Sequence, residues 1–158
     1  MRMRIDRLDV ALLRQLLKDP RAGMRAYARD LDVARGTVQS RLSRMERAGL
    51  IRSFAPQLSE AQLGFPVLAF VQLHLAQGHL DKVSAALSAI PELTEAHSIT
   101  GEGDLLCRVV ARDTEHLEDV IQRLVGIPGV VRSKSDVAMT ERVAPRVEPL
   151  LGLVRDED

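Results

Sequence analysis

One short segment, residues 35–48, concentrates side chains that form hydrogen bonds with nucleic-acid groups. On a helix with about 100° between successive residues, Val38, Leu42 and Met45 share one apolar face. The first turn and the other faces contain the candidate contact residues, which are Arg35, Gly36, Thr37, Gln39, Ser40, Ser43, Arg44 and Arg47. Guanidinium groups suit guanine edges and phosphates, and a glutamine amide suits adenine. The pattern therefore predicts a helix that enters the major groove of double-stranded DNA.

Two further helices are predicted to position this one. Apolar residues recur at helical spacing over residues 5–17 and again over residues 24–31. Residues 32–34 then form a tight turn before the third helix, and Gly49 follows that helix as a left-handed terminator. Helices in this order form a helix-turn-helix motif. Arg41 lies about 60° from the core direction of the third helix, so we expect it to pair with an acidic residue of the first helix.

The charges divide the chain into two parts. Residues 1–54 contain 13 Lys and Arg against 6 Asp and Glu, a net charge of +7, whereas the remainder has a net charge of −7. Clustered arginine is attracted to phosphate, so the first part is expected to meet a polyanion. We predict a DNA-binding domain over residues 1–54, a linker over 55–65, a second domain over 66–144 and an exposed tail over 145–158.

The second domain has a different pattern of apolar residues. Strand and helix patterns alternate along it, over residues 66–76 (strand), 79–90 (helix), 93–100 (strand), 104–112 (strand), 114–127 (helix) and 130–143 (strand). The order βαββαβ predicts a four-stranded antiparallel sheet with two helices on one face, the ferredoxin-like arrangement. The chain is thus expected to be an α+β protein in which a winged-helix-like domain precedes this sheet domain. Apolar residues on the uncovered face predict a homodimer built through it.

Several classes of function are excluded or disfavoured by composition. Aromatic residues make up only 3% of the chain, which leaves little for base stacking, and Cys107 lies in an apolar run that suits burial. The four histidines lack the spacing of a metal-binding helix, and no nucleophile adjoins a base in a known motif. We therefore expect no enzymatic activity, no metal and no cofactor. The chain has neither a membrane span nor a signal peptide, so a cytoplasmic location is expected.

Five stretches of the sequence resemble the Lrp/AsnC (feast/famine) family of transcriptional regulators. They are LD at residues 8–9, TVQSRLSRMERAGLI at 37–51, LGFPVLAFV at 63–71, TGEGDLL at 100–106 and IPGVVRSKS at 127–135. The resemblance covers residues 5–143. It implies a DNA-binding regulator whose dimers assemble into tetramers or octamers and whose effector is an amino acid.

The resemblance also places an effector site at the turn within residues 100–104. It falls on Thr100, Gly101, Gly103 and Asp104, with Ser133 and Ser135 as further candidates. An amino acid is a zwitterion, so the glycine turn would offer backbone N–H groups to its carboxylate and Asp104 would meet its ammonium group. In the alternative interpretation, the two glycines only form a hairpin turn and Asp104 only caps it.

The sequence departs from the family pattern at three positions. Members usually have glycine and serine where this chain has Asp32 and Ala34, so the third helix lacks a serine cap worth roughly 1 kcal/mol. The residue before the effector-site aspartate is often aromatic in the family and is Gly103 here. A second functional hypothesis is an amino-acid sensor or oligomeric adaptor whose basic N-terminal domain binds an acidic protein.

Overall fold

The computed structural model describes residues 3–154, and the chain divides into two compact units. The first unit contains the described residues up to Pro56 together with those from Val143 onward, and the second unit is Gln57–Arg142. The chain therefore leaves the first unit and returns to it. The sequence predicted an exposed tail over residues 145–158. Most of its described residues are exposed, and the segment groups with the first unit, where Leu151 packs against the core.

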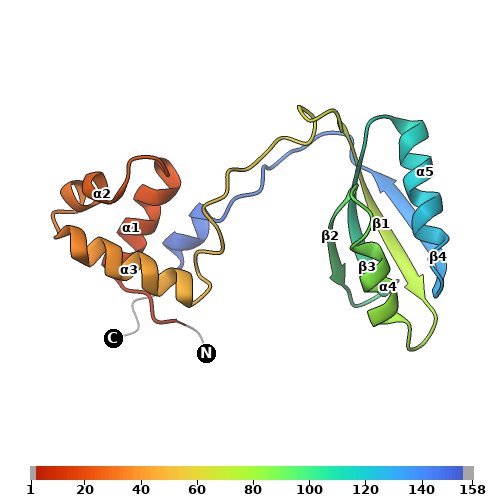
Figure 1. Ribbon diagram of the computed structural model, residues 1–158, viewed down its shortest axis with the longest axis horizontal. Coiled ribbons are helices and arrows are strands. Elements are labelled where there is room, and N and C mark those ends of the chain that lie inside the picture. The colour runs from red at the N-terminus through yellow and green to blue at the C-terminus, as the bar shows by residue number, and fades with distance from the viewer. Residues whose placement is uncertain (1–2, 155–158) are drawn as a thin grey trace. The chain divides into compact units, whose positions relative to one another are not determined.

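The first helix, α1 (Figure 1), spans Arg7–Lys18. Two aspartates fix its N-terminus. The carboxylate of Asp6 accepts a hydrogen bond from the backbone N–H of Asp9 at 2.9 Å, and the Asp9 carboxylate accepts one from the N–H of Asp6 at 3.1 Å. This reciprocal pair is a capping box, with aspartate in the place usually held by glutamate or glutamine. Negative charge at this end also complements the helix dipole.

The helix-turn-helix is formed by α2, Met24–Asp30, and α3, Arg35–Arg47. The turn between them needs one left-handed residue, and Asp32 takes that conformation with φ 52°. Gly49 ends α3 with φ 71°, as the sequence predicted. The described residues that follow α3 in this unit form no β wing. The predicted order of three helices with a tight turn is confirmed.

The core of the first unit is small. Eight buried side chains from the three helices form it, namely Leu12, Leu13, Leu16, Tyr27, Ala28, Val38, Leu42 and Met45. The C-terminal segment adds a short 3₁₀ helix, η1, at Glu148–Gly152, which contacts α1. Leu151 of η1 packs against the core, whereas Leu150 and Leu153 remain exposed.

The second unit contains four strands and two helices in the predicted order βαββαβ. The elements are β1 Val67–Leu75, α4 Leu80–Leu87, β2 Leu93–Ser98, β3 Leu105–Ala111, α5 Thr114–Val125 and β4 Val130–Val137. The strands lie in the order β2-β3-β1-β4, and every neighbouring pair is antiparallel. The α+β, ferredoxin-like prediction is therefore confirmed.

The last strand is shorter than predicted. The sequence pattern extended it to residue 143, but β4 ends at Val137. Its only neighbour is β1, which begins at Val67 and pairs Ala69 with Val137. The last contact is the hydrogen bond from the Ala138 N–H to the Leu68 carbonyl at 2.8 Å. Because the strands are antiparallel and β1 starts at Val67, the residues after Ala138 have no strand to pair with.

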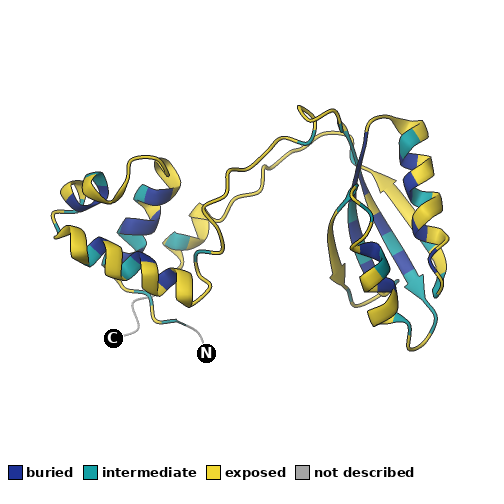
Figure 2. Cartoon of the chain, in the orientation of Figure 1, coloured by how far each residue is buried: buried dark blue, intermediate teal, exposed yellow. Residues whose placement is uncertain are grey.

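The sheet buries one face under its helices. Ala69, Val71 and Leu73 of β1 are fully buried, and the buried positions of α5 lie on the side that faces the sheet (Figure 2). Side chains alternate along a strand, so Phe70 points to the opposite face, where it is 39% exposed. No described helix of the second unit covers that face, which agrees with the predicted arrangement.

A partly buried carboxylate links α5 to the start of β2. The Glu92 side chain accepts hydrogen bonds from His116 Nε2 at 3.1 Å and pairs with the Arg123 guanidinium at 2.8 Å. The Arg123 hydrogen bond, with smaller contributions from the backbone and His116, outweighs burial and lowers the pKa of Glu92 to about 2. One of its oxygens, Oε2, is buried with no hydrogen-bond partner among the described residues.

Candidate DNA-binding and effector sites

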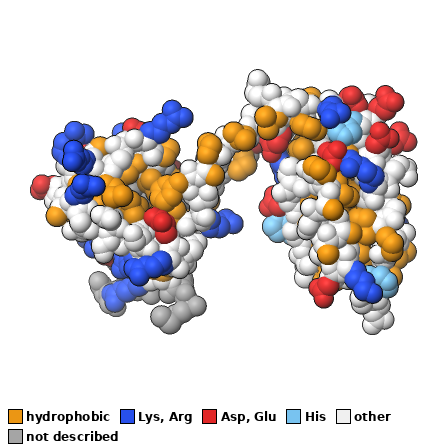
Figure 3. Space-filling view, viewed as in Figure 1, with side chains coloured by type: hydrophobic (Ala, Val, Ile, Leu, Met, Phe, Trp, Pro, Cys, Tyr) orange, Lys and Arg blue, Asp and Glu red, His pale blue; other side chains and the backbone are white. Residues whose placement is uncertain are grey.

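The helix α3 presents the predicted contact residues to solvent. Val38, Leu42 and Met45 are buried against the other helices, which fixes the rotation of α3 about its axis. All the predicted contact residues except half-buried Thr37 are exposed: Arg35, Gly36, Gln39, Ser40, Ser43, Arg44 and Arg47. The structure thus brings the whole predicted set to one accessible helix. Figure 3 shows basic side chains on the visible face of this unit.

Two arginines of α3 are held by a carboxylate from α1. Asp9 is fully buried, and it accepts from Arg41 Nη1 at 2.7 Å and from Arg44 Nη2 at 2.5 Å. Arg41 also donates to both oxygens of Asp6. Partial burial acts to raise the pKa of Asp6, but the hydrogen bond and charge of Arg41 outweigh it, so this pKa lies below its usual value. The predicted pairing of Arg41 with the first helix is confirmed.

The sequence analysis did not single out Asp9 as the carboxylate that holds both Arg41 and Arg44. A signal was present, because Leu12 and Leu13 follow it at spacings of three and four residues, which places Asp9 on the apolar stripe of α1. A carboxylate on such a stripe needs charged partners when buried. Its pairing with Arg44, whose side chain is still 45% exposed, limits the directions in which that guanidinium can point.

A shallow hollow lies on the first turns of α3. Its volume is about 440 Å³, and it is lined by Gly36, Thr37, Ser40, Arg41 and Arg44. The N-cap residue of the helix, Ala34, supplies no side-chain hydrogen bond, as the sequence predicted. The free N–H groups, the helix dipole and the guanidinium groups together favour an anion at this end of α3.

The second candidate site is the turn between β2 and β3. Gly101 and Gly103 have φ of 106° and 100°, a region that favours glycine. A Cβ on Gly103 would lie 3.4 Å from the carbonyl oxygen of Leu73, so the backbone approaches β1 closely here. The N–H of Asp104 donates to that same carbonyl at 2.9 Å. An aromatic residue in place of Gly103 would be strained in this turn.

One of the two carboxylate oxygens of Asp104 already accepts a hydrogen bond. Its Oδ2 accepts a hydrogen bond from the backbone N–H of Leu75 at 2.7 Å, which ties the turn to the end of β1. No described residue donates a hydrogen bond to its other oxygen, Oδ1. Asp104 also lines a pocket of about 380 Å³, together with Ser98, Ile99, Leu80 and the Leu75–Gly78 segment. The aspartate therefore serves the turn and still faces an open pocket.

The structure separates the remaining candidates from this pocket. Thr100, Gly101 and Gly103 lie in the turn beside it, but none of them is among its lining residues. Ser133 and Ser135 lie in β4 and pair with Leu73 and Val71 of β1. Because β1 separates β4 from β3, the two serines do not meet Asp104 within one chain.

The fold and these sites define a class of protein, a DNA-binding regulator that joins a helix-turn-helix to a ligand-binding domain. Residues 5–52 match the family model for a winged helix-turn-helix DNA-binding domain, and residues 68–147 match the model for the Lrp/AsnC ligand binding domain. The chain belongs to the Lrp/AsnC family and is a transcriptional regulator. The adaptor hypothesis, in which the basic domain binds an acidic protein, is not supported.

Relatives and solved structures agree with this assignment. The chain is 31% identical to the HTH-type transcriptional regulator Ptr1 of Methanocaldococcus jannaschii, over 72% of this chain and 76% of the relative. Its fold matches E. coli AsnC with a TM-score of 0.87 and 25% identity, over 93% of this chain and all of the other. It also matches the feast or famine regulatory protein of M. tuberculosis complexed with L-methionine, with a TM-score of 0.81 and 26% identity, over 90% and 97% of the two chains.

Within residues 3–154, none of the helices has the length and apolar character needed to span a membrane. No group of three or more histidine, cysteine or acidic residues within residues 3–154 could hold a metal ion.

Proposed function

We propose that α3 reads operator DNA through Arg35, Gln39, Ser40, Ser43 and Arg47. Arg44, the backbone N–H of Gly36 and the hydroxyl of Thr37 would contact phosphates. The exposed face of α3, fixed in rotation by its buried side chains, is the observation that carries this proposal. Arg47 Nε donates to the Ser43 carbonyl at 3.2 Å, which keeps the guanidinium along the helix. Arg44 is restrained by Asp9. Restrained donors lose less entropy when they bind DNA.

An amino acid is the proposed effector, and the pocket beside the Gly101–Asp104 turn is its proposed site. Asp104 supplies a charge for the ammonium group, and the glycine turn supplies exposed backbone for the carboxylate. The methionine complex of the related M. tuberculosis regulator supports this ligand class. Ser133 and Ser135 can contribute only if they come from another copy of the chain, since β1 separates them from Asp104.

The uncovered sheet face is the proposed dimer contact. It carries apolar side chains beside charged ones, including Phe70 and Arg108, and Arg108 pairs with Glu60 at 2.9 Å. A two-fold pair would set two copies of α3 in successive major grooves about 34 Å apart, or at a multiple of that distance. Dimers would associate further into tetramers or octamers. A cytoplasmic location, where the DNA is, follows from this function.

Alanine variants of the α3 face test the DNA proposal. Fluorescence anisotropy with duplex DNA from the region upstream of the protein's own gene measures the affinity of each variant. Arg35→Ala and Arg47→Ala are each expected to lose about 1 to 3 kcal/mol of binding free energy with no change in assembly size. Arg142→Ala, in the second unit, is the matched loss of an arginine and should bind as the unaltered protein does. Unchanged affinity in both α3 variants would refute this face.

A further inference from the structure

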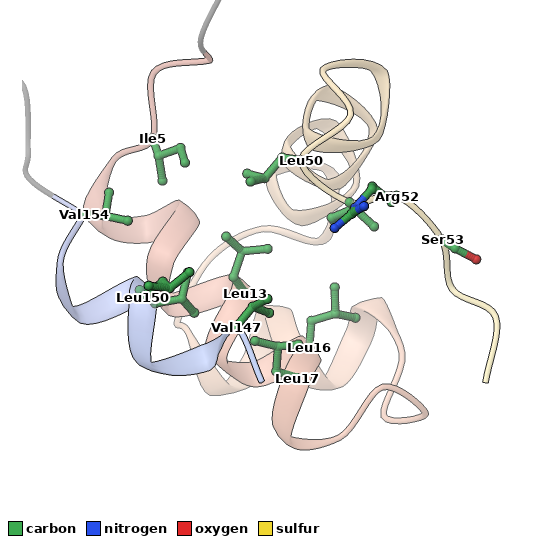
Figure 4. A pocket seen from close by; sticks show the side chains of 12 residues that line it. Ile5, Leu13, Leu16, Leu17, Leu50, Arg52, Ser53, Val147, Leu150 and Val154 are labelled. Atoms are coloured by element: carbon green, nitrogen blue, oxygen red, sulfur yellow. The ribbon is translucent and has the colours of Figure 1, made fainter. Parts of the chain in front are cut away.

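A second pocket lies entirely within the first unit, between α1, the segment after α3 and the C-terminal segment (Figure 4). Its volume is about 420 Å³. Leu13, Leu16 and Leu17 of α1 form one wall, Leu50 closes one side, and Leu150 of η1 forms part of the opposite wall. The pocket shares no lining residue with the α3 face or with the Gly101–Asp104 turn.

The lining has a definite chemical character. Ten of its twelve residues are aliphatic, and no aromatic ring is among them. Three of these side chains are also unusually exposed for leucine, namely Leu17 at 47%, Leu50 at 39% and Leu150 at 59%. Apolar surface gathered around a concavity of this volume is typical of a ligand site, whereas scattered exposed leucines are not.

Among the described residues, a single charge borders this apolar space. Arg52 is the only charged residue in the lining, and no ion pair joins it to another residue within the described part of the chain. The other polar residue, Ser53, already accepts a hydrogen bond from the Ala55 N–H at 2.8 Å. An aliphatic slot with one unpaired guanidinium at its edge complements a molecule with a hydrocarbon chain and one anionic end.

We propose that this pocket binds a medium-chain aliphatic carboxylate, with the chain between α1 and the C-terminal segment and the carboxylate at Arg52. The site goes beyond the DNA and effector functions, since it shares no residue with either. Leu151 already packs against the helical core from the same segment. A bound chain would add apolar contacts between that segment and α1, so the ligand would fasten the C-terminal segment to the DNA-binding unit.

Decanoate, below its micelle concentration, is the probe, and isothermal titration of the full chain measures its binding. One site per chain is expected, with decanol weaker and decylamine weakest because the cation is repelled by Arg52. Arg52→Gln should weaken decanoate about two- to fivefold, as expected for an exposed ion pair, and leave decanol unchanged. Equal binding of all three probes, or no loss in Arg52→Gln, would overturn the carboxylate assignment.

Paired leucine variants locate the site. Leu150→Gln should weaken decanoate about tenfold through lost apolar contact, while Leu153→Gln, in the same segment but outside the lining, should bind as the unaltered protein does. Leu17→Gln repeats the test from α1. In protein with labelled leucine methyl groups, decanoate should shift the signals of Leu13 and Leu17 and leave Leu58 of the second unit unmoved.

The same variants test whether another copy of the chain fills this pocket in place of a small molecule. If decanoate does not bind and Leu150→Gln instead lowers the assembly size in sedimentation, the pocket is a contact between copies of the chain and the proposal is wrong. Failure of decanoate to bind without any change in assembly also refutes it. Neither result bears on DNA affinity, which is measured separately.

Discussion

The two units are stabilised by different means. In the second unit, thirteen buried apolar residues form the core, and no side chain of its ion pairs, such as Glu92 and Arg123, is fully buried. In the first unit, only eight residues form the core, and a fully buried carboxylate, Asp9, lies beside them. The small DNA-binding unit thus depends on polar contacts to place α3, whereas the sheet depends on apolar packing.

The small core and the buried carboxylate of the first unit affect how firmly α3 is held. A core of eight residues has little apolar area to exclude alternative packings of α3. Asp9 adds a directional restraint, because its two oxygens hold guanidinium groups from two successive turns of that helix. The same contacts that position the recognition helix also orient Arg44 at its surface. In the second unit, the turn beside the proposed effector pocket is tied to the sheet by the hydrogen bond from the Leu75 N–H to the Asp104 carboxylate.

The largest effect is expected from the apolar core of the sheet. Leu73 is fully buried in the central strand β1, so Leu73→Ala should lower the free energy of unfolding by about 3 to 4 kcal/mol through lost burial and a cavity. Urea denaturation followed by circular dichroism measures this. Leu68→Ala, on the partly exposed face of the same strand, is the control and should cost clearly less. Equal losses would contradict the assignment of the two faces.

A smaller loss of stability, with a loss of DNA affinity, is expected at Asp9. Asp9→Ala removes half of the capping box and leaves Arg41 and Arg44 without their buried partner, which should cost about 2 to 3 kcal/mol. The arginines can still reach water, so the cost stays below that of two buried charges. Asp30→Ala breaks only the exposed pair with Arg29 and should change stability by under about 0.5 kcal/mol. A loss no greater than that of Asp30→Ala would show that the buried contacts of Asp9 do not stabilise the first unit.

The second unit should also lose stability in acid through Glu92. Its pKa is about 2 in the folded state against an ordinary value of 4.5, so its contribution is present above about pH 4.5 and is lost as the pH falls toward 2. The contribution at neutral pH is at most about 3 kcal/mol. Glu92→Gln should therefore be destabilising at pH 7 and much less so at pH 3, as measured by urea denaturation at both values. A pH-independent difference would contradict the proposed role of the Arg123 pair.

The smallest effect on stability is expected at Asp104, where the change is in ligand binding. Asp104→Asn keeps an oxygen for the Leu75 N–H but removes the charge, so the turn should remain and the amino-acid response should fall about tenfold or more. Titration calorimetry with the common amino acids measures this. Asp104→Ala, which loses both the hydrogen bond and the charge, is the comparison. Retained effector binding in Asp104→Asn would show that the aspartate serves only the turn.

Much of this structure was predictable from local patterns. The bounds of α2 and α3, the Gly49 terminator and the order βαββαβ follow from periodicity and turn residues, and the angle of Arg41 on its helix indicated its ion pair. Three features depend on contacts distant in sequence. The end of β4 is set by the length of β1, the partnership of Asp9 with Arg44 joins two helices, and the packing of Leu151 joins the chain's end to α1. None of these follows from a window of neighbouring residues.

The central claim is that the first unit binds DNA through α3 in a sequence-dependent way. Anisotropy of the purified protein with its own upstream duplex and with a scrambled duplex, over a series of salt concentrations, tests it most directly. The account predicts a linear fall of log affinity with log salt, with a slope that reports several phosphates, and tighter binding to the upstream duplex. Absence of binding to both duplexes at low salt, in protein shown to be folded, would contradict it.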